Sequence, residues 1–480
     1  MKVKTRSLLS LGMLLALYLS SAASAADKAS KEPAKKKSKP NVIIIYADDM
    51  GYGDLGCYGC KDIPTPNIDQ LAADGVRLTD GYVSAPQCAP SRVGLLSGKY
   101  QNRLGFEYNV SKEDPKYAGL GFPREEKTVG DLMKAQGYTT GVIGKWHMGL
   151  RPDLHPNKRG FDEFFGTLYG NSNFIPPFNR FSKDLKGPNK PESDIQRNGK
   201  EVDEKDYLTD AFTREAVAFI DQYHVKPFFL YLPYTAPHGP LQATEKYLKR
   251  FPNIKHPKRK IYAAMVSSLD DGVGKIMAKL KERNLEENTL VFFISDNGGT
   301  QKSSYGDNGP LKNWKGSLNE GGIRVPFVMT WKGTLPAGVV NDKSVIQLDA
   351  TATAVALAGG DISDMDGVNL MPYLLKQKDG VPHEQLFWRI MSWRYKSTGE
   401  PYQKATRRGD WKLVLTGKEW QLYNLKNDIS EKNDVAAEHP ELVHELRASW
   451  DKWETTLQFP RFPADSPIFP WEELRQKAKQ

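Results

Sequence analysis

A continuous apolar run at residues 41–47 constrains the fold more than any other feature of the chain. It reads Asn-Val-Ile-Ile-Ile-Tyr-Ala, and an apolar run without polar alternation is typical of a strand buried on both faces of a parallel sheet. Further apolar runs lie at 139–143, 228–234, 289–295 and 325–331. Helical patterns separate these runs, so the sequence predicts an α/β fold whose central, mostly parallel sheet is doubly wound and flanked by helices.

The remaining elements follow from caps, prolines and glycines. A strand is expected at 76–84, and helices are expected at 65–75, from Pro90 onward, and at 128–136, 207–223, 261–283 and 348–358. Beyond residue 371 the pattern changes to short strands separated by tight polar turns, and a helix follows them. The strands are expected at 385–390, 403–407, 411–415 and 420–424, and the helix is expected at 440–454. This part predicts a small C-terminal α+β subdomain with an antiparallel sheet.

The length of 480 residues exceeds what one ordinary core supports. We therefore predict a large domain over 41–370 and a C-terminal subdomain over 371–480. A basic, Lys/Pro-rich linker at 26–40 precedes them and has the composition of a solvated tether.

The first residues have the pattern of a secretory signal. A basic start with Lys2, Lys4 and Arg6 precedes the apolar stretch 8–19 and a small-residue site ending at Ala25. The apolar stretch is short for a membrane span. We expect a signal peptide over 1–25, cleaved near Ala25, export to the periplasm or the extracellular space, and no membrane insertion after cleavage; the alternative is an uncleaved anchor.

Charge narrows the class of partner. The formal net charge of +9 falls to +6 once Lys2, Lys4 and Arg6 are removed with the signal. A basic exported protein suits a polyanion, either nucleic acid or a sulfated polysaccharide.

Two polar pairs follow predicted strands, Asp48-Asp49 after the first and Asp296-Asn297 after 289–295. In open α/β sheets ligands bind beyond the carboxyl ends of the strands. Either pair alone is better explained as a turn or a helix cap. Together they favour an oxygen-ligand site for a hard cation, Ca²⁺ or Mg²⁺.

Basic side chains follow other strands. Lys145 and His147 are two residues apart, so an extended segment would present both on one face as an anion clamp. His238 lies between two prolines, which fixes it in the manner of a general acid. Lys315 precedes a glycine-rich turn into a strand. Each alone has an ordinary explanation as a surface lysine or a hydrogen-bonded loop histidine.

The chain has three cysteines, too few for a disulfide framework. Cys57 and Cys60 are expected to form a local disulfide or to remain as two buried thiols. Cys88 opens the stretch Cys-Ala-Pro-Ser-Arg, where Pro90 begins a short helix and Arg92 follows. For an isolated cysteine, a small buried thiol before a core helix is the ordinary explanation, although a helix N-terminus favours an anion.

The motif Cys-x-Pro-Ser-Arg resembles the signature of type I, formylglycine-dependent sulfatases of the alkaline-phosphatase-like superfamily, in particular arylsulfatases and N-acetylgalactosamine-6-sulfatases. The resemblance covers roughly 41–330 in chain order, and 387–389 and 409–412 resemble the family's C-terminal subdomain. It implies a sulfuric ester hydrolase of the EC 3.1.6 type. Gln87 and the Ser-Gly-Lys at 97–99 depart from the common pattern outside the core motif.

The resemblance also implies a site. One Ca²⁺ ion, with Mg²⁺ as the alternative, would be bound by Asp48, Asp49, Asp296, Asn297 and Cys88 after its oxidation to formylglycine (3-oxoalanine). The catalytic set would be Cys88, Arg92, Lys145, His147, His238, Asp296 and Lys315.

We assign roles within this set as a hypothesis. Asp296 is the base for the attacking hydroxyl of the formylglycine hydrate, His238 is the acid for the leaving oxygen with help from Lys315, and His147 is the base for the expulsion of sulfate. The hydrate avoids a trapped covalent sulfate because its second hydroxyl can expel sulfate and restore the aldehyde. The implied partners are a sulfated sugar or polysaccharide and a formylglycine-generating or anaerobic sulfatase-maturating enzyme, with no nucleic acid.

Two alternatives stay open at this point. One is a phosphate or phosphonate monoesterase of the same superfamily, and the other is a catalytically inactive polyanion-binding relative. The aromatic residues Phe387, Trp388, Trp393, Tyr395 and Tyr402 could stack on a sugar, although core packing is the more common role for such residues.

Overall fold

The computed structural model describes residues 39–109, 120–181, 193–392, 395–461 and 474–476. The expected signal segment 1–25, nearly all of the linker 26–40 and Trp393 lie outside the described residues. The described residues from Lys39 onward belong to one compact unit.

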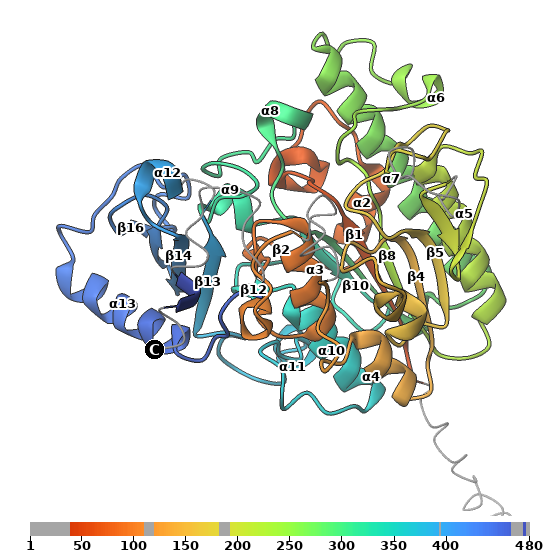
Figure 1. Cartoon of the computed structure of the whole chain (residues 1–480). Coiled ribbons are helices and arrows are strands. Elements are labelled where there is room, and N and C mark those ends of the chain that lie inside the picture. Colours follow the sequence, from red (N-terminus) through yellow and green to blue (C-terminus); the bar gives the residue numbers. More distant parts are fainter. Residues whose placement is uncertain (1–38, 110–119, 182–192, 393–394, 462–473, 477–480) are drawn as a thin grey trace, which may run out of the picture. The chain divides into compact units, whose positions relative to one another are not determined.

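A ten-stranded sheet forms the centre of this unit, in the order β11-β2-β10-β9-β1-β8-β4-β5-β6-β7 (Figure 1). Its strands are β1 (Asn41–Ala47), β2 (Val76–Leu78), β4 (Thr139–Lys145), β5 (Glu163–Thr167), β6 (Ile195–Arg197), β7 (Lys200–Glu201), β8 (Phe228–Pro233), β9 (Thr289–Ser295), β10 (Phe327–Thr330) and β11 (Val339–Asn341). Strands β9, β1, β8, β4 and β5 run parallel, and β10 and β6 are antiparallel to their inner neighbours. The predicted mostly parallel sheet is confirmed.

Helices cover both faces of this sheet (Figure 1). They are α3 (Cys88–Ser97), α4 (Val129–Ala135) and α10 (Leu348–Ala358) on one face, and α2 (Pro66–Ala73), α5 (Leu208–Tyr223) and α7 (Pro257–Glu282) on the other. Strand β1 shows why both faces are apolar. Val42 and Ile44 pack into the first layer, whereas Ile43 and Ile45 pack into the second, because successive side chains of a strand point to opposite faces.

Short elements connect these layers. The short helices are α6 (Glu245–Leu248), α8 (Gln301–Ser304), α9 (Glu320–Ile323), α11 (Met371–Leu374) and α12 (Tyr395–Thr398), and the 3₁₀ turns are η1 (Tyr52–Asp54), η2 (Gly56–Tyr58), η3 (Gln101–Leu104), η4 (Pro152–Leu154), η5 (Pro156–Lys158) and η7 (Glu286–Asn288).

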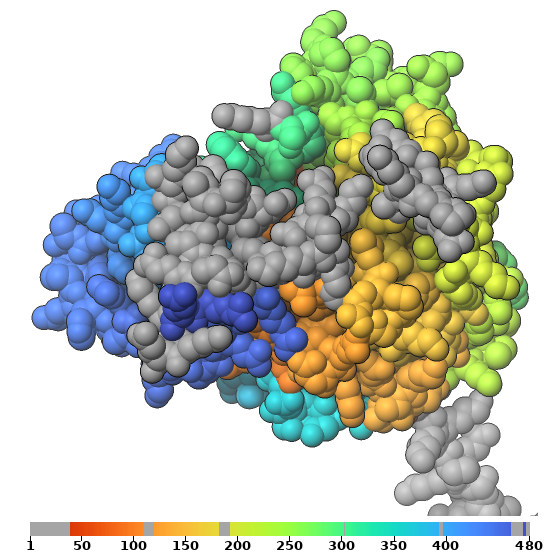
Figure 2. All heavy atoms as spheres, in the orientation of Figure 1, coloured from red at the N-terminus to blue at the C-terminus, as the bar shows by residue number. Residues whose placement is uncertain are grey.

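The C-terminal residues form a separate antiparallel sheet, as predicted, and appear in blue in Figures 1 and 2. Its strands are β13 (Gln385–Met391), β14 (Tyr402–Arg408), β15 (Trp411–Leu415) and β16 (Gln421–Asn424), and α13 (Pro440–Glu454) packs against it. Trp388 is fully buried, and Phe387 stacks on Trp453 with ring centroids 5.3 Å apart. Trp388 therefore belongs to the core, and Phe387 is partly buried and packs against it.

Several predicted boundaries were wrong. The strand expected at 76–84 is two strands, β2 and β3 (Gly81–Tyr82), and β3 pairs with β12 (Val345–Ile346) in a sheet of their own. The strand breaks where Asp80 turns to pair with Arg324 and Arg407. Helix α7 begins at Pro257, before the expected residue 261, because proline suits a first helical position.

Within the part of the chain that the structure describes, the helices are too short or too polar to cross a membrane.

Candidate active site

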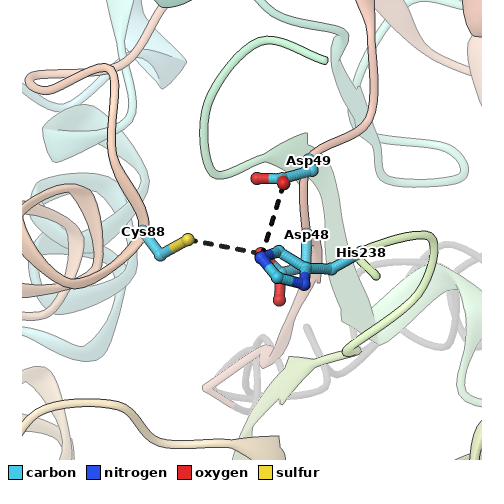
Figure 3. A group of neighbouring side chains, drawn as sticks. All are labelled: Asp48, Asp49, Cys88 and His238. Carbon is cyan, nitrogen blue, oxygen red and sulfur yellow. Dashed lines mark hydrogen bonds and ion pairs between the residues drawn. The ribbon is translucent and has the colours of Figure 1, made fainter. Parts of the chain in front are cut away.

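The register of the central strands brings the two polar pairs together. Ala47 of β1 is the partner of Ser295 of β9, so the next residues, Asp48 and Asp296, leave the sheet side by side. The backbone N–H of Asp49 donates to Asp296 Oδ1 at 3.1 Å. Asp49 has a φ of +62°, which turns its side chain away from the strand direction and toward His238 (Figure 3).

Helix α3 supplies the predicted nucleophile at its first residue. Cys88 begins the helix, two residues earlier than expected from Pro90. Its Sγ lies 3.6 Å from Asp48 Oδ1 (Figure 3) and 3.0 Å from Lys315 Nζ. Arg92 follows one turn later, fully buried, and its Nη2 contacts Asp296 Oδ2 at 2.8 Å. The helix start thus places both groups against the carboxylates.

Two lysines reach the same carboxylates from separate elements. Lys145, the last residue of β4, places Nζ 2.6 Å from Asp48 Oδ2, and both side chains are fully buried. Lys315 places Nζ 2.6 Å from Asp49 Oδ1. The cluster therefore combines several cations with several carboxylates at the carboxyl end of the sheet.

The histidines lie at the edge of this cluster. His238 Nε2 is 3.5 Å from Asp49 Oδ2, and its Nδ1 lies 2.6 Å from the carbonyl oxygen of Gly239. His147 does not continue β4 in the extended form expected from the sequence, because its φ is +60°. Lys145 and His147 therefore do not share one face of an extended strand, although both remain near the cluster.

Burial and charge act against each other on the central acids. Burial raises the pKa of the Cys88 thiol, but Lys145 and Lys315 outweigh it and lower that pKa to about 6. Burial and the neighbouring Asp48 raise the pKa of Asp296 to about 6, although the Arg92 guanidinium acts to lower it. For Asp49, burial is outweighed by Lys315 and His238, so its pKa falls well below the usual range.

The two histidines shift in opposite directions. Burial lowers the pKa of His147 well below its usual value, and Lys145 and Arg92 lower it further. Burial would also lower the pKa of His238, but Asp49 and Asp48 outweigh it and raise that pKa. The site thus holds one histidine that favours the neutral form and one that favours the charged form, a pairing suited to acid–base chemistry.

The donor set fits a hard cation in part. Ligand atoms of Asp48, Asp49, Cys88 and His238 lie within 4.8 Å of one another. This group contains three of the predicted ligands and adds His238, which was not among the predicted ligands. Asn297 donates from Nδ2 to Asp49 Oδ1 at 2.8 Å, and its buried Oδ1 has no hydrogen-bond partner among the described residues. Carboxylate and amide oxygens of this kind suit Ca²⁺ or Mg²⁺.

Other residues at the site were missed by sequence reasoning. Asn109 Oδ1 accepts from the backbone N–H of Ala89 at 3.0 Å and so caps the start of α3. Gly170 lies so close to His147 that a Cβ there would be 2.6 Å from His147 Nε2. Neither residue lies in a recognisable motif, so the sequence held no signal for them.

Cys57 and Cys60 are free thiols in the structure, half-buried near η2. Cys60 Sγ donates to Asp62 Oδ1 at 3.2 Å. The sequence allowed either a local disulfide between Cys57 and Cys60 or two thiols, and the structure has two thiols.

Family models match most of the chain. The Sulfatase model matches residues 40–360, and the model described as N-sulphoglucosamine sulphohydrolase, C-terminal, matches residues 314–455.

Individual relatives agree. The chain is 37% identical over 358 residues to N-acetylgalactosamine-6-sulfatase of Canis lupus familiaris, a match that covers 70% of this chain and 66% of that protein. It is 30% identical to arylsulfatase J of Mus musculus over 90% of this chain and 78% of that protein. The solved structure of Ps i-CgsB in complex with k-i-k-neocarrahexaose is 40% identical, with a TM-score of 0.83, over 92% of this chain and 97% of that chain. The chain belongs to the sulfatase family.

Proposed function

We propose that this protein is a sulfatase that hydrolyses sulfate esters, with residue 88 as the nucleophile after conversion of the Cys88 side chain to formylglycine. The observation that carries the proposal is the position of Cys88 Sγ, 3.0 Å from Lys315 Nζ and 3.6 Å from Asp48 Oδ1 at the start of α3. In the converted chain, an oxygen on the same Cβ takes the place of this sulfur atom.

The residues that would hold a Ca²⁺ ion are Asp48, Asp49, Asp296 and Asn297, together with residue 88. The Oδ1 of Asn297 supports this assignment, because it is buried and has no hydrogen-bond partner within the described part of the chain. When bound, the cation neutralises sulfate oxygens, and the formylglycine hydrate provides a hydroxyl nucleophile that can later release sulfate.

The ammonium groups of two lysines would bind the sulfate group of the substrate. Lys145 Nζ lies 2.6 Å from Asp48 Oδ2, and Lys315 Nζ lies 2.6 Å from Asp49 Oδ1. A sulfate group placed against residue 88 would be within reach of both ammonium groups. Arg92, which pairs with Asp296 at 2.8 Å, would steady the formylglycine hydrate.

The histidines complete the proton transfers. His238 has its Nε2 directed toward Asp49 and a raised pKa, which suits a group that donates a proton to the leaving oxygen. His147 has a lowered pKa and a buried Nδ1 without a hydrogen-bond partner among the described residues, which suits a base. Asp296 takes the proton from the attacking hydroxyl.

The substrate class we propose is a sulfated carbohydrate. The solved structure of Ps i-CgsB, a 40% identical relative, is a complex with k-i-k-neocarrahexaose, and this supports carrageenan fragments as the first substrates to test. Fragments of ulvan, fucoidan and glycosaminoglycans extend the screen. The net positive charge of the chain suits an anionic polymer of this kind.

We also propose where and how the protein matures. The basic and apolar start of the chain supports export to the periplasm or the extracellular space with cleavage near Ala25. A formylglycine-generating or anaerobic sulfatase-maturating enzyme is then the required partner. Residues 41–370 would form the catalytic domain and 371–480 the C-terminal subdomain.

Parallel assays on an aryl sulfate and an aryl phosphate test the function. The wild type should release sulfate with a large preference over phosphate, and Cys88→Ala should abolish release while Cys57→Ala and Cys60→Ala retain it. A preference for phosphate would favour a monoesterase, and binding of sulfated glycan without sulfate release would favour an inactive relative.

A further inference from the structure

The turn that carries Lys315 needs support from outside itself. Residues 312–319 lie between β9 and α9 without a long helix or strand of their own. Two of them have positive φ, Asn313 at +63° and Gly316 at +86°, a region that non-glycine residues rarely adopt. The Lys315 side chain is only 17% exposed and reaches Asp49 and Cys88. Its placement therefore depends on how the turn is held.

The large domain holds one side of the turn. The backbone N–H of Lys315 donates to Gly299 O at 3.2 Å, and that of Gly316 donates to Pro86 O at 2.8 Å. Both acceptors lie beside the site, because Pro86 is two residues before Cys88 and Gly299 is two residues after Asn297.

A side chain of the C-terminal sheet contacts the turn from the other side. Gln403, in β14, donates from Nε2 to Gly316 O at 2.7 Å and accepts at Oε1 from the backbone N–H of Leu318 at 3.1 Å. Gln403 is 2% exposed, so these bonds form in a buried environment where a misplaced partner is costly. They grip the backbone directly after Lys315.

We propose that Gln403 is a positioning residue that sets the place of Lys315 Nζ over residue 88, so that the C-terminal sheet acts on the reaction through this turn. The proposal rests on the sulfatase function proposed above. Gln403 itself contacts the turn and not the reacting group.

The downstream end of the turn is anchored separately. Glu431 accepts from Asn319 Nδ2 at 3.1 Å and from the backbone N–H of Glu320 at 2.7 Å. Lys412 in β15 bridges Glu320 at 2.8 Å and Glu431 at 3.1 Å. Because these contacts fix the start of α9, loss of Gln403 should loosen the turn near Lys315 and leave the C-terminal sheet in place.

The first test compares Gln403→Leu with Gln385→Leu. Gln385 lies in the neighbouring strand β13 and donates to Thr406 Oγ1 and Ser449 Oγ, so it hydrogen-bonds within the C-terminal part and not to the turn. On an aryl sulfate, Gln403→Leu should lower kcat/KM by roughly 10- to 100-fold, as expected for a catalytic group displaced by about 1 Å, whereas Gln385→Leu should stay near wild type. Equal effects of the two variants would overturn the proposal.

A double-mutant cycle asks whether the effect passes through Lys315. In a Lys315→Met background, Gln403→Leu should cause no further loss of kcat/KM, because the group that it positions is gone. A full additional loss would show that Gln403 acts by another route. If Gln403→Leu does not fold, Gln403→Asn is used instead, because the shorter amide cannot span both backbone groups.

Two measurements do not depend on turnover. Inorganic sulfate should bind Gln403→Leu roughly tenfold more weakly than wild type or Gln385→Leu by calorimetry, as expected for one weakened charged contact. Amide hydrogen exchange of a peptide covering 312–320 should accelerate in Gln403→Leu only. A wild type that releases no sulfate would refute the sulfatase function. The exchange rate and the sulfate affinity would still decide the role of Gln403. If both were unchanged in Gln403→Leu, the positioning role of Gln403 would be refuted.

Discussion

Lys145 and Asp48 form an ion pair in which neither side chain reaches solvent. Lys145 Nζ lies 2.6 Å from Asp48 Oδ2, and both side chains are 0% exposed. The pair joins the ends of β4 and β1 at the level where Cys88 begins α3. The pair is therefore a structural contact, and its Lys145 ammonium group also belongs to the proposed sulfate-binding site.

Removal of one partner should be costly for stability. In metal-depleted protein, Lys145→Met leaves Asp48 buried, with Arg92 at 3.6 Å as its remaining ion-pair partner among the described residues. The free energy of unfolding should then fall by about 3 kcal/mol. The control is Lys134→Met, which removes the partly exposed pair with Asp162 and should cost at most about 1 kcal/mol. Urea denaturation measures both, and similar losses in the two variants would contradict the buried pair.

Metal removal should abolish activity reversibly. A chelator should stop sulfate release, and added Ca²⁺ or Mg²⁺ should restore it, because Asp48, Asp49 and the buried Asn297 Oδ1 offer oxygen ligands that suit these cations. Asp49→Asn should demand more cation for half-maximal recovery. Asp62→Asn, which changes a 45% exposed carboxylate outside the site, should recover like wild type. Full activity in the presence of chelator would count against the metal site.

A histidine far from the reacting group should make stability depend on pH. His383 Nε2 lies 2.8 Å from Asp349 Oδ1. Burial would lower the pKa of His383, but the Asp349 carboxylate outweighs it and raises that pKa above its usual value. A raised histidine pKa stabilises the fold fully below the unfolded value of about 6.5 and loses this contribution as pH rises through the folded value.

The free energy of unfolding should therefore decline as pH increases from about 6.5. His383→Gln should flatten this decline, and His444→Gln, which changes an exposed histidine on α13, should leave it unchanged. Denaturation at several pH values measures the slope. An unaltered slope in His383→Gln would show that another group is responsible.

A substitution at Gly170 tests the role of His147 without replacing the histidine itself. Gly170→Ala would place a Cβ 2.6 Å from His147 Nε2, so the imidazole must move. We expect kcat to fall by about 10- to 100-fold with a small change in melting temperature. Gly417→Ala is the control, since no atom lies within 4 Å of the Cβ that it adds. Wild-type kcat in Gly170→Ala would argue against a catalytic role for His147.

The sequence was informative where a pattern repeats. The apolar run of β1 and the alternation of strands and helices predicted the parallel sheet, and α10 and α13 have the predicted bounds. Strands β6, β7 and β11, toward the two ends of the sheet, were missed because they are two or three residues long, which is too short for periodicity. The C-terminal hairpins were predicted because polar turns such as the one at Gly409 separate them.

The candidate site followed from strand ends and from one motif. Asp48, Asp296, Cys88 and Lys315 do lie together in the structure. The turn of the backbone at His147 was not predictable, because a φ of +60° at a histidine leaves no trace in residue order. Gly170 and Gln403 lie next to residues distant in sequence, His147 and Gly316 respectively, so only the folded chain reveals these neighbours.

The central claim is that residue 88 of the working enzyme is no longer a cysteine. Active protein, produced together with its maturing enzyme, should be digested and the peptide that contains residue 88 weighed by mass spectrometry. We predict that the peptide has lost the thiol and gained an aldehyde, and that the aldehyde fraction scales with sulfate release. An unmodified Cys88 thiol throughout a fully active preparation would contradict the account.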